Sequence, residues 1–79
     1  MNNQTPDTKT GFYYVSAIDG DKFALMLGPF ETHEQALAKV EECRNLAYDL
    51  HPASHWWLWG TCRKDDGAKL GRMNETMGI

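Results

Sequence analysis

Hydrophobic and polar positions alternate with a short period early in the chain and change to a helical period after residue 32. Residues 12–18 are rich in aromatic and β-branched side chains, which favour strands. The turn at 19–22 contains an Asp-Gly pair, which suits the positive φ angles of a tight hairpin. Residues 23–27 form the return strand, and the hydrophobic residues of 33–50 recur at steps of three and four. The pattern therefore predicts a hairpin followed by one amphipathic helix.

The boundaries of this helix have recognisable signals. Gly28 and Pro29 are expected to end the second strand, because glycine packs no side chain and proline has no N–H. Thr32 is the expected N-cap, and Gln35, three residues later, completes a capping box. Pro52 ends the helix, since the residue before a proline is disfavoured in the α region. The third strand is predicted over residues 55–63.

These elements predict an α+β fold with the order β-β-α-β. The compact arrangement is an antiparallel three-stranded sheet in the spatial order 2-1-3, with the helix packed on one face. The polar residues 1–10 are expected to be a disordered leader, and 11–63 a single domain. Residues 64–79 have mixed charge and three glycines, which predicts a flexible or loosely packed tail.

A cluster of three tryptophans gives the strongest indication of a binding surface. Trp56 and Trp57 are adjacent, so on a strand they point to opposite faces. One helix covers only one face, and the other face is expected to contact a second molecule or a folded-back terminus. We assign Trp57, Trp59 and Tyr14 to that second face. Carboxylates on the polar side of the helix are added as expected partner contacts: Glu34, Glu41 and Glu42.

Composition narrows the function classes. The chain has 79 residues and a formal net charge of −3, which disfavours direct nucleic-acid binding. It has no apolar run long enough for a membrane span, and residues 1–10 contain no apolar signal segment. We therefore expect a cytoplasmic protein without membrane contact, in which both cysteines stay reduced.

Side chains with metal-ligand or nucleophile chemistry are scattered. Cys43, His51, His55 and Cys62 are ligand types, but they include no Cys-x-x-Cys pair, and Pro52 separates the histidines. Structural zinc sites use closely spaced pairs. Cys43 is on the apolar helix face, which is typical of a small buried hydrophobe. We predict no metal, no cofactor, no catalytic residue and no enzymatic activity.

One local stretch resembles half of a SPOR domain. It consists of Leu27-Gly28-Pro29-Phe30 followed by a helix with Glu34, Ala36 and Val40. SPOR domains bind glycan strands through their sheet, so this resemblance implies an alternative function. In that alternative, an aromatic sheet face binds a glycan or a single strand by stacking.

A broader resemblance covers most of the predicted domain. It runs from Tyr14-Val15 through Leu27–Phe30 and Thr32–Leu37 to Gly60-Thr61, and it is similar to small uncharacterised proteins of bacteriophages and prophages. The resemblance implies expression in the cytoplasm of an infected bacterium. Small acidic phage proteins there bind host proteins such as CRISPR effectors, nucleases or polymerases, and anti-CRISPR inhibitors are one example. We therefore expect a non-catalytic protein-binding module that inhibits or modulates a host protein or complex, with a homodimer as a second form of association.

Overall fold

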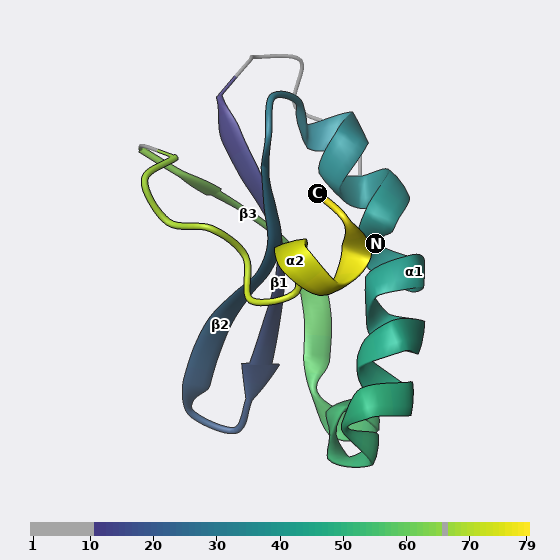
Figure 1. Ribbon diagram of the computed structural model, residues 1–79. Coiled ribbons are helices and arrows are strands. Elements are labelled where there is room, and N and C mark those ends of the chain that lie inside the picture. Colours follow the sequence, from purple (N-terminus) through teal and green to yellow (C-terminus); the bar gives the residue numbers. More distant parts are fainter. Residues whose placement is uncertain (1–10, 66) are drawn as a thin grey trace.

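The computed structural model describes residues 11–65 and 67–79, and its elements confirm the predicted α+β fold (Figure 1). The three strands form one antiparallel sheet in the order β2-β1-β3, as predicted, and α1 packs on it. The elements are β1 (Phe12–Asp19), β2 (Lys22–Phe30), α1 (His33–Leu50), the 3-10 helix η1 (Pro52–Trp56), β3 (Leu58–Lys64) and the single-turn α2 (Asn74–Met77).

Helix α1 begins with the expected capping box. The Thr32 Oγ1 accepts a hydrogen bond from the Gln35 backbone N–H at 3.2 Å, and the Gln35 Oε1 accepts one from the Thr32 N–H at 3.2 Å. At the other end, the His51 N–H donates to the Ala47 carbonyl, and Pro52 starts η1. The predicted bounds, 33–50, are confirmed.

Strand β2 is longer than predicted, because it continues through Gly28 and Pro29 to Phe30. The register with β1 shifts between Tyr13 and Val15, so the extra length is absorbed by an irregularity in the pairing. Gly28 has φ +136°, and a Cβ at this position would lie 2.8 Å from the Tyr13 carbonyl oxygen. The glycine therefore allows close strand approach here, and the prediction that it ends the strand is wrong.

Strand β3 begins later than predicted, at Leu58 rather than at residue 55. Pro52 occupies the start of η1, where its missing N–H costs nothing. The Ser54 N–H donates to the His51 carbonyl and the Trp57 N–H to the Ser54 carbonyl. These turn bonds keep Trp56 out of the strand, and its side chain is 83% exposed.

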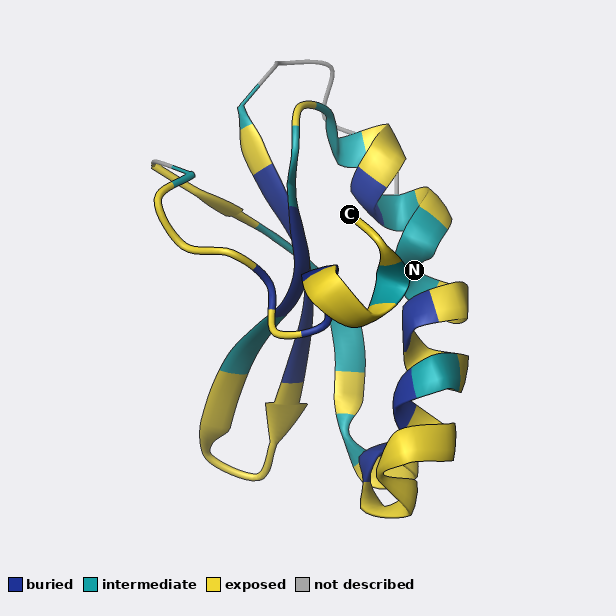
Figure 2. Ribbon diagram, viewed as in Figure 1, coloured by how far each residue is buried: buried dark blue, intermediate teal, exposed yellow. Residues whose placement is uncertain are grey.

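The core lies between α1 and the sheet. On the α1 face, Val15 and Ala17 of β1 pack with Cys43 and Ala47 of α1. Figure 2 shows the buried residues along the middle of the sheet and on the side of α1 that faces it. Partly buried hydrophobic side chains complete this cluster: Ala24, Phe30, Val40, Leu46, Trp57, Trp59 and Met77.

The C-terminal segment covers part of the opposite face and then closes the edge of β2. The Tyr14 hydroxyl donates to the Lys69 carbonyl. The N–H groups of Gly71, Arg72 and Met73 donate to the carbonyls of Gly28, Leu25 and Met26 at 3.1, 3.0 and 2.8 Å. In Figure 1 this segment leaves β3, runs on the side of the sheet away from α1 and returns to β2.

Two side chains of this segment are buried. Met73 contacts the core through its Sδ, 3.7 Å from the Cys43 Sγ. Asn74 bonds to both backbone polar groups of Gly28. Gly71 packs so closely on β2 that a Cβ there would lie 2.4 Å from the Leu27 Cα. The predicted loosely packed tail is therefore wrong for residues 71–77, while the predicted leader lies outside the described residues.

We expect Thr32→Ala to destabilise the fold by about 1 kcal/mol, the usual loss for a removed N-cap. Denaturant unfolding followed by circular dichroism measures this change. Thr76→Ala, at an exposed position outside α1, is the matched control. Equal stabilities of the two variants would show that the capping box contributes nothing.

We expect Asn74→Ala to cost about 2 kcal/mol, because it leaves the buried N–H of Gly28 without its partner, while the Gly28 carbonyl keeps the hydrogen bond from the Gly71 N–H. The neighbouring Glu75→Ala, at an exposed position, should change stability by less than about 0.5 kcal/mol. Both values come from denaturant titration. A loss below about 1 kcal/mol for Asn74→Ala would contradict a structural role of the C-terminal segment.

Candidate interaction surface

Tyr14 is fully buried, and its hydroxyl donates to the C-terminal segment, so the folded-back terminus is the alternative found at this residue and its role as a partner contact is wrong. The register pairs Tyr14 with Cys62 and Ala17 with Trp59, which puts Tyr14 and Trp59 on opposite faces of the sheet. The C-terminal segment lies over Tyr14, and its Lys69 carbonyl accepts a hydrogen bond from the Tyr14 hydroxyl.

Trp57 and Trp59 lie on the α1 side, so the prediction that they share an exposed face with Tyr14 is also wrong. Their rings stack with centroids 6.0 Å apart, and the Trp59 Nε1 donates to the Ser54 carbonyl at 3.1 Å. Both side chains are partly buried, and they line a groove between α1 and β3. We call this the aromatic groove; its other lining residues are Arg44, Asn45, Tyr48, His55 and Leu58.

The predicted acidic contacts are exposed on α1. Glu34, Glu41 and Glu42 lie away from the buried helix stripe of Ala36 and Cys43. Only Glu42 has an ion-pair partner among the described residues, with its Oε1 3.4 Å from the Lys39 Nζ. Exposed pairs of this kind contribute little stability. Their contact with a partner stays a prediction.

An exposed row of hydrophobic side chains crosses the face opposite α1 near the β1–β2 hairpin. Ile18 pairs with Phe23 on one side and with Leu58 on the other. The three residues are 38%, 51% and 70% exposed. Strand alternation together with the register of both strand pairs gives their common face. What the sequence could not give is where the C-terminal segment stops covering that face.

Three cations border the same face. A groove is lined there by the apolar residues Phe23, Leu25 and Leu70 and by the cations Lys64, Lys69 and Arg72, with Ala24 completing it. Among the described residues, 11–65 and 67–79, the lining includes no acidic side chain, although the whole chain has a net charge of −3. We call the combination of Ile18, Phe23, Leu58, Leu70 and these three cations the open face.

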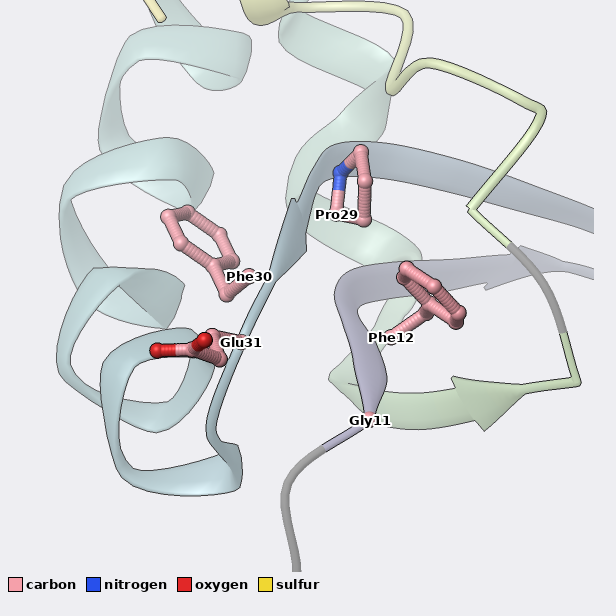
Figure 3. Close-up of a pocket in the computed structure, with 5 residues that line it drawn as sticks. All are labelled: Gly11, Phe12, Pro29, Phe30 and Glu31. Atoms are coloured by element: carbon pink, nitrogen blue, oxygen red, sulfur yellow. The ribbon is translucent and has the colours of Figure 1, made fainter.

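A third pocket opens where β1 begins and β2 ends. It is lined by Gly11, Phe12, Pro29, Phe30 and Glu31. Figure 3 shows Phe30 pointing toward α1, while Phe12 points away from it. Of the lining residues that the structure describes, Glu31 is the only one with an ionisable side chain. A single exposed carboxylate offers neither an acid–base pair nor an activated nucleophile.

The two cysteines are free and lie on opposite faces of the sheet. Burial raises the pKa of the Cys43 thiol to about 11, and the nearby Glu42 charge adds to the shift. Burial also raises the pKa of Cys62, against smaller opposing effects of Ser16 and Lys64. Both thiols are therefore protonated at neutral pH and lack the thiolate that a nucleophile requires.

Residues 11–65 and 67–79 contain no group of three or more His, Cys, Asp or Glu side chains that could hold a metal ion. Within the same residues, no helix has the length and apolarity needed to cross a membrane. Comparison of the chain with protein-family models, with curated proteins and with solved structures finds no match.

We expect stability to fall as the pH rises from about 9 to about 11, because the Cys43 thiol then ionises in the unfolded chain but stays protonated in the fold. A shift from 9.0 to about 11 corresponds to at most about 3 kcal/mol. Urea unfolding at stepwise pH measures the slope. Cys43→Ala should flatten it between pH 9 and 11, and an identical slope in both proteins would contradict the assignment.

Proposed function

We propose that this chain is a non-catalytic protein-binding module whose open face receives an acidic, apolar segment of a partner protein. The observation that carries the proposal is the exposed row Phe23–Ile18–Leu58, which joins all three strands. Contiguous apolar surface of this kind is uncommon on soluble proteins outside contact regions.

Within the described part of the chain, the row is left uncovered although the C-terminal segment lies beside it. Three backbone hydrogen bonds hold residues 71–73 at the outer edge of β2. The segment covers Tyr14, whereas Ile18 at the hairpin end of β1 stays exposed. These hydrogen bonds fix the position of the C-terminal segment beside the exposed row. This supports a role of the uncovered row in binding another molecule.

The charges of the open face indicate the chemistry of the partner. Lys64, Lys69 and Arg72 surround apolar side chains, so carboxylates on a partner would be attracted while its apolar residues pack on Phe23 and Leu70. Complementary charges of this kind favour specificity and fast association. A nucleic acid also carries negative charge, but the net charge of −3 and the aliphatic lining favour a protein.

A narrower proposal concerns the biological setting. The resemblance to bacteriophage proteins supports a host protein as the partner, bound and inhibited or modulated in the bacterial cytoplasm. The exposed carboxylates Glu34, Glu41 and Glu42 would suit the basic channel of a CRISPR effector, nuclease or polymerase. This acidic side of α1 is separate from the open face.

The alternative of glycan or single-strand binding has less support from the geometry. Stacking needs accessible ring faces, yet Tyr14 is buried and the rings of Trp57 and Trp59 stack on each other beside α1. Among the described residues that define the open face, Phe23 is the only aromatic one, and the exposed Trp56 lies in η1, outside the sheet.

We expect Phe23→Ser and Lys69→Glu each to reduce capture of a partner from bacterial lysate by at least about tenfold, because both remove contacts at the same surface. The charge-matched control is Lys39→Glu on α1. Mass spectrometry identifies proteins captured by the wild type, and purified partner confirms the affinities. Thermal melts check that each variant is folded.

Equal capture of one specific partner by the wild type, Phe23→Ser and Lys69→Glu would contradict a role of the open face. Loss of capture only with Glu41→Lys would assign binding to α1 instead. Capture that disappears on nuclease treatment would indicate a nucleic acid in place of the protein segment.

A further inference from the structure

The two edge strands of the sheet, β2 and β3, differ in the hydrogen bonds made on their outer sides. At the outer edge of β2, the N–H groups of residues 71–73 donate hydrogen bonds to the carbonyls of Gly28, Leu25 and Met26. At the outer edge of β3, the described residues supply no backbone hydrogen bond; β3 pairs only with β1. An edge strand of this kind is a template for another strand.

The backbone groups that point outward from β3 follow from the register. The Leu25 carbonyl accepts from Arg72 and therefore points away from β1. Its partner Ser16 then directs its own N–H and C=O toward β3, where it pairs with Gly60. Gly60 faces β1, so the alternate residues Trp59, Thr61 and Arg63 direct their N–H and C=O groups outward.

We propose that this edge binds the same edge of a second copy, so that two β3 strands pair antiparallel with Thr61 opposite Thr61. The sheets of both copies then join into one continuous sheet. The contact is isologous, and it closes with two copies because each copy offers one such edge. The proposal does not depend on the identity of any other partner.

The sequence of β3 is self-complementary in this orientation. The strand begins with apolar Leu58 and Trp59 and ends with the cations Arg63 and Lys64. With Thr61 at the centre, Trp59 of one copy lies opposite Arg63 of the other, both on the α1 side. A parallel pairing would instead bring like cations together, which destabilises neighbouring strands.

The aromatic groove provides a site for the incoming cation. Trp57 and Trp59 line it beside β3, and guanidinium groups are attracted to aromatic ring faces. Arg63 makes this kind of contact within its own copy, where its Cζ lies 5.8 Å from the Tyr13 ring centroid. Exposed hydrophobic residues also gather at this end of the molecule: Tyr48, Leu50, Trp56 and Leu58.

Sedimentation equilibrium of the full chain tests the proposal with a matched pair of variants. Thr61→Pro removes the outward N–H, which is not used in pairing with β1, and also removes the hydroxyl that lies 2.8 Å from the His33 Nε2. Thr61→Val removes only the hydroxyl. We expect dimers for the wild type and Thr61→Val, and monomers for Thr61→Pro with retained circular dichroism.

A cross-link tests the register independently, including the case in which Thr61→Pro does not fold. In a Cys62→Ser background, Thr61→Cys should form an intermolecular disulfide on mild oxidation, because opposite residues of an antiparallel pair lie within disulfide range. Asp65→Cys in the same background should form little intermolecular disulfide, because position 65 does not lie opposite itself in this register. A monomeric wild type at high concentration would overturn the proposal, as would a dimer that survives Thr61→Pro or lacks the cross-link at position 61.

Discussion

Burial of both faces of β1 is the constraint on which the rest of this structure depends. Its residues Tyr13–Ala17 are all buried, although a single helix covers only one side of a sheet. The second side is covered by the C-terminal segment, which accepts a hydrogen bond from the Tyr14 hydroxyl and then donates backbone hydrogen bonds to β2. Because the segment then places Met73 against Cys43, one stretch of chain contributes to both sides of the sheet. A small domain thereby obtains a larger core than its β-β-α-β elements alone provide.

The parts of the fold that could be predicted are those encoded by local periodicity and capping. The helix bounds follow from Thr32, Gln35 and Pro52, and the sheet order follows from short connections between a hairpin and one helix. Strand ends were less predictable, because Gly28 supports continued pairing by its backbone conformation. From the sequence alone, a glycine in a strand can indicate either the end of the strand or a place where two strands approach closely.

The surface was harder to predict than the fold. Whether Tyr14 is exposed depends on a cover more than fifty positions away in the sequence, and local pattern carries no information about such a contact. Assigning Trp57 and Trp59 to the face of Tyr14 failed for a simpler reason: the register pairs Tyr14 with Cys62, so their side chains alternate out of phase. Ile18, Phe23 and Leu58 were accessible to the same reasoning once the hairpin register was known, because both pairings of Ile18 are regular.

The separation of charge across the sheet has a kinetic consequence. Carboxylates predominate on the solvent side of α1, while Lys64, Lys69 and Arg72 lie on the other side of the sheet. The charges of these described residues are therefore distributed unevenly between the two sides of the sheet. An uneven distribution of charge favours some orientations over others when a molecule approaches a charged macromolecule. The lifetime of a complex depends mainly on short-range apolar packing. The association and dissociation rates can therefore change independently.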